Sequence, residues 1–88
     1  MTVSAFLGNS HSLKEKRMVL KSLKDRVHDR FNVSIAEVDD QDLWQKVSLG
    51  VAVVSTETKH ALSVLKEVEQ FLRLHPLLTV CSAETEIL

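Results

Sequence analysis

The longest periodic segment of the chain, residues 12–31, sets the main constraint on what the rest can form. Apolar side chains recur along it at helical spacing, at Leu13, Leu20, Leu23, Val27 and Phe31. The segment opens with a serine followed three residues later by a glutamate, which is the pattern of a capping box. It therefore predicts an amphipathic helix whose apolar stripe must be buried against a second layer.

Shorter segments on either side of this helix predict the remaining layer. Alternating residues indicate strands at 2–7, 32–38, 44–54 and 77–87, and a second amphipathic helix runs from a cap at Ser55 to just before Pro76. The resulting order is typical of a ferredoxin-like α+β fold. We expect one domain, residues 1–88, with an antiparallel sheet in the order 4-1-3-2 and both helices on one face.

Charge is unevenly distributed between the first helix and the rest of the chain. Residues 12–31 carry seven basic and three acidic side chains, a net charge of +4, whereas the whole chain has a net charge of −1. At ~100° per residue, one flank of the helix collects Lys14, Arg17, Lys21 and Lys24. We predict that these four residues bind RNA phosphates. The alternative is a solvated helix face with its own ion pairs.

The predicted topology places the turn 39–42 at the same end of the domain as the start of the first helix. We expect Lys14 or Lys16 to form an ion pair with a carboxylate of this turn, with Lys16 extending along the apolar stripe toward solvent. The aspartates could instead hold a divalent cation, but ion pairing is favoured. We expect the functional residues at this end of the domain to be Lys16, Gln41, Asp42 and Trp44. In this arrangement Asp42 accepts hydrogen bonds within the turn and Trp44 covers the open sheet edge.

Several kinds of site are not indicated by the sequence. The four histidines lack metal-ligand spacing, and neither a catalytic triad nor a nucleophile elbow appears, so we predict no metal, cofactor or catalytic residue. The single cysteine, Cys81, is expected to be a small core residue, and one unpaired cysteine fits a reducing cytoplasm. Neither a signal peptide nor a run of ~20 apolar residues is apparent.

Three short motifs resemble a known family. SLKEKR at 12–17, FNVSIAEV at 31–38 and QDLWQ at 41–45 are similar to the YlxP-like family of small bacterial proteins of unknown function. The resemblance implies a ferredoxin-like fold. It also implies a ribosome-associated role, because genes of this family often lie beside those of translation factors and ribosome-binding factor A. It supplies no catalytic residues, and the first strand is shorter here than is usual in the family.

These observations leave three functional hypotheses open. The first is a non-catalytic module that binds ribosomal or pre-ribosomal RNA, with little base recognition because stacking aromatics are few. The second is a protein adaptor or structural oligomer. A homodimer is expected because strand 44–54 is apolar on both faces and helices cover only one. The third is a small phosphatase-like enzyme at residues 8–11, a loop that lacks an arginine to hold phosphate.

Overall fold

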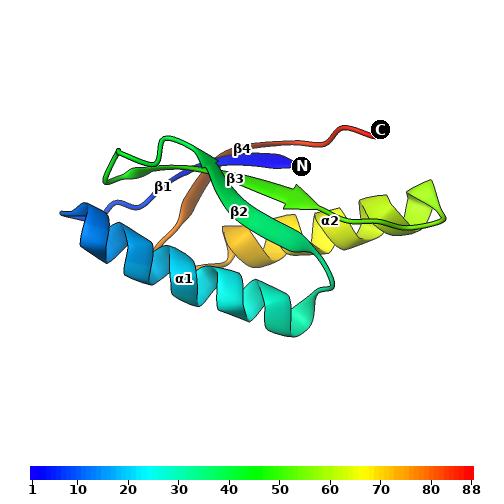
Figure 1. Cartoon of the computed structure of the whole chain (residues 1–88), viewed down its shortest axis with the longest axis horizontal. Helices are drawn as coiled ribbons and strands as arrows, with labels where there is room; N and C mark the ends of the chain where they lie inside the picture. The colour runs from blue at the N-terminus through cyan, green and yellow to red at the C-terminus, as the bar shows by residue number, and fades with distance from the viewer.

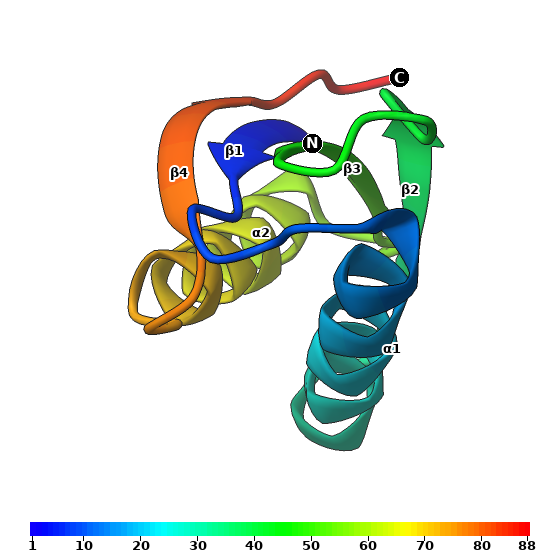
Figure 2. The ribbon, with the colours of Figure 1, turned by 90° about the vertical axis from the view of Figure 1, so that its left-hand side faces the viewer.

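The computed structural model describes all residues from 1 to 88 and has the predicted order of elements. The elements are β1 (Thr2–Phe6), α1 (Leu13–Arg30), β2 (Ser34–Asp39), β3 (Lys46–Ala52), α2 (Thr58–Arg73) and β4 (Thr79–Glu84). All strand pairs are antiparallel in the order β2-β3-β1-β4, and both helices lie on one face of the sheet (Figures 1 and 2). The ferredoxin-like α+β prediction is confirmed.

The core lies between the sheet and the two helices. Alternate residues of the central strands β1 and β3 are buried on the helix side, including Val3, Ala5, Val47 and Leu49, each with no exposed surface. The helices spread apart in Figure 2, and the ring of Phe31 meets that of Phe71 on α2 edge to face at 5.9 Å. Neither helix is both long and apolar enough to cross a membrane.

The two helices begin differently. The hydroxyl of Ser12 accepts from the amide of Glu15 at 3.1 Å, so the predicted cap of α1 is confirmed. The Glu15 carboxylate in turn accepts from the amide of His11 at 2.8 Å. The predicted cap at Ser55 is wrong, because its hydroxyl accepts from the amide of Glu57 and closes a turn, and α2 begins only at Thr58.

The open face of the sheet is less apolar than expected. Strand β3 is shorter than predicted, so Trp44 and Val54 lie outside it. The side of β3 that faces away from the helices carries Lys46, Ser48, Gly50 and Ala52. The prediction of a strand that is apolar on both faces is therefore wrong. The expected homodimer stays a prediction, but the apolar surface that suggested it is smaller than the sequence indicated.

Cys81 is another departure from expectation. The sheet register shifts between β1 and β4, so that Ala5 pairs with Val80 while Ser4 pairs with Ser82. Cys81 is the extra residue at this irregularity, and its side chain is exposed on an edge strand. The prediction of a core cysteine is wrong because strand alternation is interrupted at this position.

Candidate functional site

The basic flank of α1 is exposed as the sequence predicts. We call Lys14, Arg17, Lys21 and Lys24 the basic strip; the first three are exposed and the fourth is half-buried. Lys21 lies 3.1 Å from the carboxylate of Asp25, and both side chains are mostly solvated. The other three make no ion pair, so most of the strip keeps its charge available. Ion pairing within the helix, as the solvated-face alternative expects, is present at one of the four residues, and both interpretations of the strip stay open.

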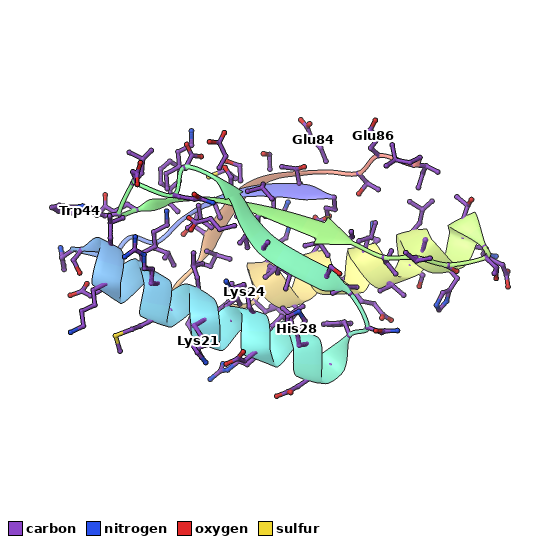
Figure 3. The ribbon with its side chains drawn as sticks, in the orientation of Figure 1. Lys21, Lys24, His28, Trp44, Glu84 and Glu86 are labelled. Carbon is purple, nitrogen blue, oxygen red and sulfur yellow. The ribbon has the colours of Figure 1, made fainter.

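The position of Arg30 shows which way the basic strip faces. Arg30 lies on the flank of α1 that is turned toward α2, and its guanidinium is 5.0 Å from the centre of the Phe71 ring of α2. At ~100° per residue, the strip is turned roughly half a revolution from Arg30. It therefore faces away from α2, toward the outside of the domain beside the edge strand β2, and Figure 3 labels Lys21, Lys24 and the neighbouring His28.

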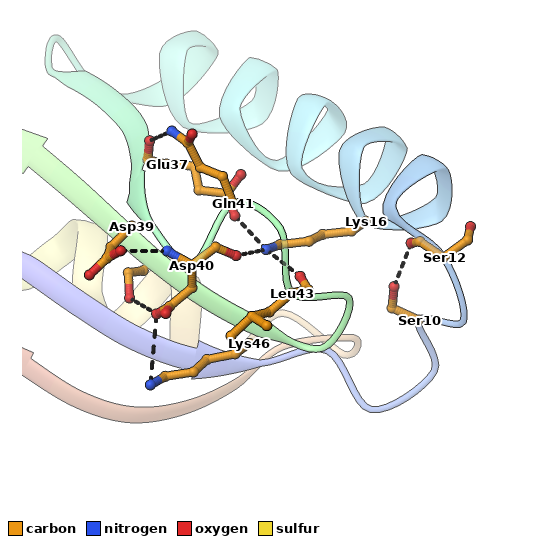
Figure 4. A network of polar contacts seen from close by, with 10 residues as sticks. Ser10, Ser12, Lys16, Glu37, Asp39, Asp40, Gln41, Leu43 and Lys46 are labelled. Carbon is orange, nitrogen blue, oxygen red and sulfur yellow. Dashed lines mark hydrogen bonds and ion pairs between the residues drawn. The ribbon is translucent and has the colours of Figure 1, made fainter.

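Lys16 is the most unusual residue of the α1 amino-terminal turns. Its side chain is only 1% exposed, yet its ammonium group meets three acceptors (Figure 4). Nζ donates to the carbonyls of Asp40 at 2.7 Å and Leu43 at 2.6 Å, and lies 2.6 Å from Oε2 of Glu37. An ammonium has three donors. Two of them are used by the carbonyls, and Glu37 is held by charge, since its Oε2 accepts no hydrogen bond. Lys16 thus fastens the β2–β3 turn to the start of α1.

The β2–β3 turn and the start of α1 lie at the same end of the domain, as predicted, but the contacts between them differ from the prediction. Lys16 reaches the turn, but it does not extend to solvent, and no carboxylate of residues 39–42 pairs with it or with Lys14. The ion-pair partner is Glu37, which follows Ile35 on the helix side of β2 and is partly buried there. The turn contributes backbone carbonyls to Lys16 in place of carboxylates.

The aspartates of the turn have other partners. Asp39 Oδ1 accepts from the amide of Asp40 at 2.8 Å. Asp40 has a positive φ of 59°, and its Oδ2 accepts from the hydroxyl of Ser48 at 2.7 Å and lies 3.8 Å from Nζ of Lys46. Asp42 is exposed and accepts no hydrogen bond, so the prediction that it closes the turn is wrong. Asp39 and Asp40 accept hydrogen bonds instead, Asp39 from within the turn and Asp40 from Ser48 of β3.

The backbone around Trp44 is held on both sides. Lys16 binds the carbonyl of Leu43, and the carbonyl of Gln45 accepts from the amide of Leu7 at 2.7 Å. The Gln45 side chain donates to the carbonyl of Ser10 at 3.3 Å. Trp44 itself is 54% exposed and projects at the end of the sheet (Figure 3). Trp44 lies in the β2–β3 loop outside the strands, and the expectation that its ring covers an open sheet edge stays a prediction.

Two further residues of this end were not singled out by the sequence analysis. Glu37 lies two residues after Ile35 on the helix-facing side of β2, and an inward carboxylate requires a counter-charge, so this alternation was the available signal. Lys46 lies directly opposite Phe6 in the β1–β3 register. That pairing is a property of the sheet and has no signature in the local sequence. Gln41, which was predicted for this end, donates to the carbonyl of Glu37 at 3.2 Å.

The structure thus defines a ferredoxin-like domain with a basic outer helix flank and a turn pinned by a buried lysine. The family model described as "Protein of unknown function (DUF503)" matches residues 1–85. The chain is 46% identical over 65 residues to the "Uncharacterized protein YlxP" of Bacillus subtilis (strain 168), across 74% of this chain and 71% of that protein. The chain belongs to the DUF503 family, and the resemblance to YlxP-like proteins is confirmed. Neither description states an activity.

Proposed function

We propose that this protein is a cytoplasmic, non-catalytic module that binds ribosomal or pre-ribosomal RNA through the basic strip. The observation that supports the proposal is the strip itself: four basic residues on one outward flank of α1, three of them without an ion pair, in a chain of net charge −1. Cations in such a row displace the counterions of a phosphate backbone, which favours association with RNA of any sequence.

The rest of the chain limits and orients this binding. Outside residues 12–31 the net charge is −5, since the whole chain has −1 and the helix segment has +4. RNA is therefore repelled from other directions and attracted to α1. Four neutralised phosphates correspond to a slope of about −3 to −4 in a plot of log affinity against log salt concentration. We expect weak binding to bare RNA and stronger binding to a shaped ribosomal particle.

The test is co-sedimentation of charge-reversal variants with ribosomal subunits at low and moderate salt. The strip variant replaces four residues by glutamate: Lys14, Arg17, Lys21 and Lys24. The control variant makes the same change in charge elsewhere: Arg26, Lys59, Lys66 and Arg73. The two are matched because each breaks one i,i+4 ion pair, Lys21–Asp25 in the strip and Arg73–Glu69 in the control.

We expect the strip variant to lose co-sedimentation and the control variant to retain it. Circular dichroism of both variants verifies that the helices remain folded. If the folded strip variant sediments with the subunits as well as the parent does, or if the parent itself does not bind at low salt, the proposal is refuted. The protein-adaptor hypothesis then takes its place.

A further inference from the structure

The four aromatic residues of the chain divide into two pairs with different surroundings. Phe31 and Phe71 pack against each other in the helical layer. Phe6 and Trp44 are 46% and 54% exposed, and both lie at the end of the sheet where β3 begins. Other large apolar side chains of this chain are equally exposed, so exposure alone does not distinguish these two. What they share is an aromatic ring and a place at the same end of the sheet.

A cation lies beside Phe6 and close to Trp44 in the chain. Lys46 is opposite Phe6 in the sheet register and two residues after Trp44. Its side chain is 46% exposed, and the contact with Asp40 is long, 3.8 Å. The other end of the same face carries Glu84, paired in register with Thr2. At the Phe6 end a phosphate competes with the Asp40 carboxylate for Lys46, and the long Lys46–Asp40 contact leaves the ammonium group accessible to it.

The side chains next to Phe6 and Lys46 in the central strands are small. They are Ser4 and Ser48, which are paired with each other, and the Ser48 hydroxyl donates to the Asp40 carboxylate at 2.7 Å. The turn that presents Trp44 is already ordered by Lys16 and Gln45. A ligand that contacts Trp44 therefore does not have to order the loop, which favours binding.

The basic strip begins at this same end. Lys14 and Arg17 lie in the first turns of α1, on either side of Lys16 in sequence, and Lys16 binds the carbonyl of the residue that precedes Trp44. Phosphate contacts on α1 and aromatic contacts at Trp44 are thus available to one extended chain. Paired aromatics beside cations are the arrangement by which many proteins hold single-stranded nucleic acid.

We propose that the ligand of this end is single-stranded RNA, with successive bases stacked on Trp44 and Phe6 and with Lys46 contacting phosphate. This inference rests on the proposed RNA-binding function and specifies its ligand as unpaired RNA. Stacking accepts any base, because every base has a π-face. The contact supplies selectivity for single strands over duplexes, which present few unstacked bases.

Intrinsic fluorescence tests the stacking directly, since Trp44 is the single tryptophan of the chain. The probes are a uridine dodecamer, an RNA duplex of the same length and inorganic polyphosphate, a polyanion without bases. We expect the dodecamer to quench Trp44, the duplex to quench it much less, and polyphosphate to bind without quenching it. Equal quenching by polyphosphate, or binding of the dodecamer without quenching, overturns the inference.

Substitutions separate this inference from the proposed function. Trp44→Ala should weaken binding of a fluorescein-labelled dodecamer, measured by anisotropy, roughly 5- to 150-fold, the range for one stacked base, with the salt slope unchanged. Trp44→Phe should restore most of the affinity. Leu74→Ala, at an apolar residue 83% exposed just after α2, serves as the control and should have no effect.

The pattern of losses shows which idea fails. If reversal of the basic strip abolishes binding while Trp44→Ala and Phe6→Ala bind like the parent, the stacking inference is wrong and the proposed function stands. If the aromatic variants weaken binding while the strip reversal does not, the α1 site is wrong and the stacking surface is retained. Because Trp44 lies in a loop and is exposed, its variants test the inference even where Phe6→Ala lowers the stability of β1.

Discussion

Replacing Lys16 with methionine is the most informative perturbation of the fold. Methionine has a similar length but no charge, so the substitution keeps the volume and removes every polar contact of the ammonium group. The carbonyls of Asp40 and Leu43 lose their donor, and the carboxylate of Glu37, whose side chain is only 16% exposed, loses its counter-charge.

The expected loss is large relative to the stability of so small a domain. Breaking a buried ion pair by removing one partner costs ~3–5 kcal/mol, because the other charge stays buried without compensation. At roughly 0.05–0.15 kcal/mol per residue, an 88-residue domain has a total of about 4–13 kcal/mol. Lys16→Met should therefore reduce the free energy of unfolding by about 3–5 kcal/mol. If the parent has only about 4 kcal/mol in total, the variant will not fold.

Urea unfolding followed by circular dichroism measures this loss, and Lys21→Met is the control. Lys21 is 79% exposed in its pair with Asp25, so its removal should change the free energy of unfolding by at most about 1 kcal/mol. Because Lys16 holds the carbonyl of Leu43, its loss should also release the neighbouring Trp44. In the folded variant the fluorescence anisotropy of Trp44 should then fall below that of the parent.

A double variant identifies the partner of Lys16. Adding Glu37→Gln to Lys16→Met removes the unpaired carboxylate, so the double variant should be more stable than the single one although the two carbonyls still lack a donor. The reasoning is refuted if Lys16→Met changes the free energy of unfolding by less than about 1 kcal/mol. It is refuted equally if the double variant is no more stable than the single one.

Four further predictions follow from other parts of the structure. Ser12→Ala should cost about 1 kcal/mol in urea unfolding through loss of the α1 cap, whereas Ser12→Thr should cost less. Gly50→Ala would place its Cβ 2.7 Å from a methyl carbon of Val38; it should cost about 1 kcal/mol, and in a Val38→Ala background most of that cost should vanish. Burial, followed by the positive charge of Arg26, lowers the pKa of His75 below its ordinary 6.5, so the unfolded chain binds more protons just below that pH. Stability should therefore rise as the pH increases toward 6.5 and then level off, and His75→Gln should remove this rise in thermal unfolding across the same pH range. A symmetric homodimer through the open sheet face or an edge strand also stays a prediction; the edge strand is the arrangement that leaves Phe6 and Lys46 free for RNA. A single monomeric species in sedimentation velocity at tens of micromolar would contradict it.

The sheet topology could be predicted from local patterns because each pattern has one dominant physical cause. Apolar residues at period 3.6 must face a second layer, and alternating residues must divide between two faces. The order of these segments then leaves few topologies open. The cap at Ser12 and the outward basic strip follow in the same way, since both depend on neighbours within one helix.

The candidate site at the turn could be predicted only in its location. Opposite charges at a shared end indicated an ion pair, but the choice of Glu37 over the aspartates depends on which side of β2 each carboxylate lies. Within the turn, Asp40 adopts a positive φ and bonds to Ser48 of β3, which takes its carboxylate away from Lys16. Burial of the lysine itself depends on backbone carbonyls, and these have no sequence signature.

Residues far apart in the sequence determined the remaining features. The exposure of Cys81 depends on a register shift between β1 and β4. The few apolar side chains on the open face of β3 depend on where its pairing with β1 and β2 ends. Phe6 and Lys46 are forty residues apart, and only the register of the central strands brings them together. Local periodicity specifies which face a residue takes, whereas its neighbours across strands are set by the packing of the whole domain.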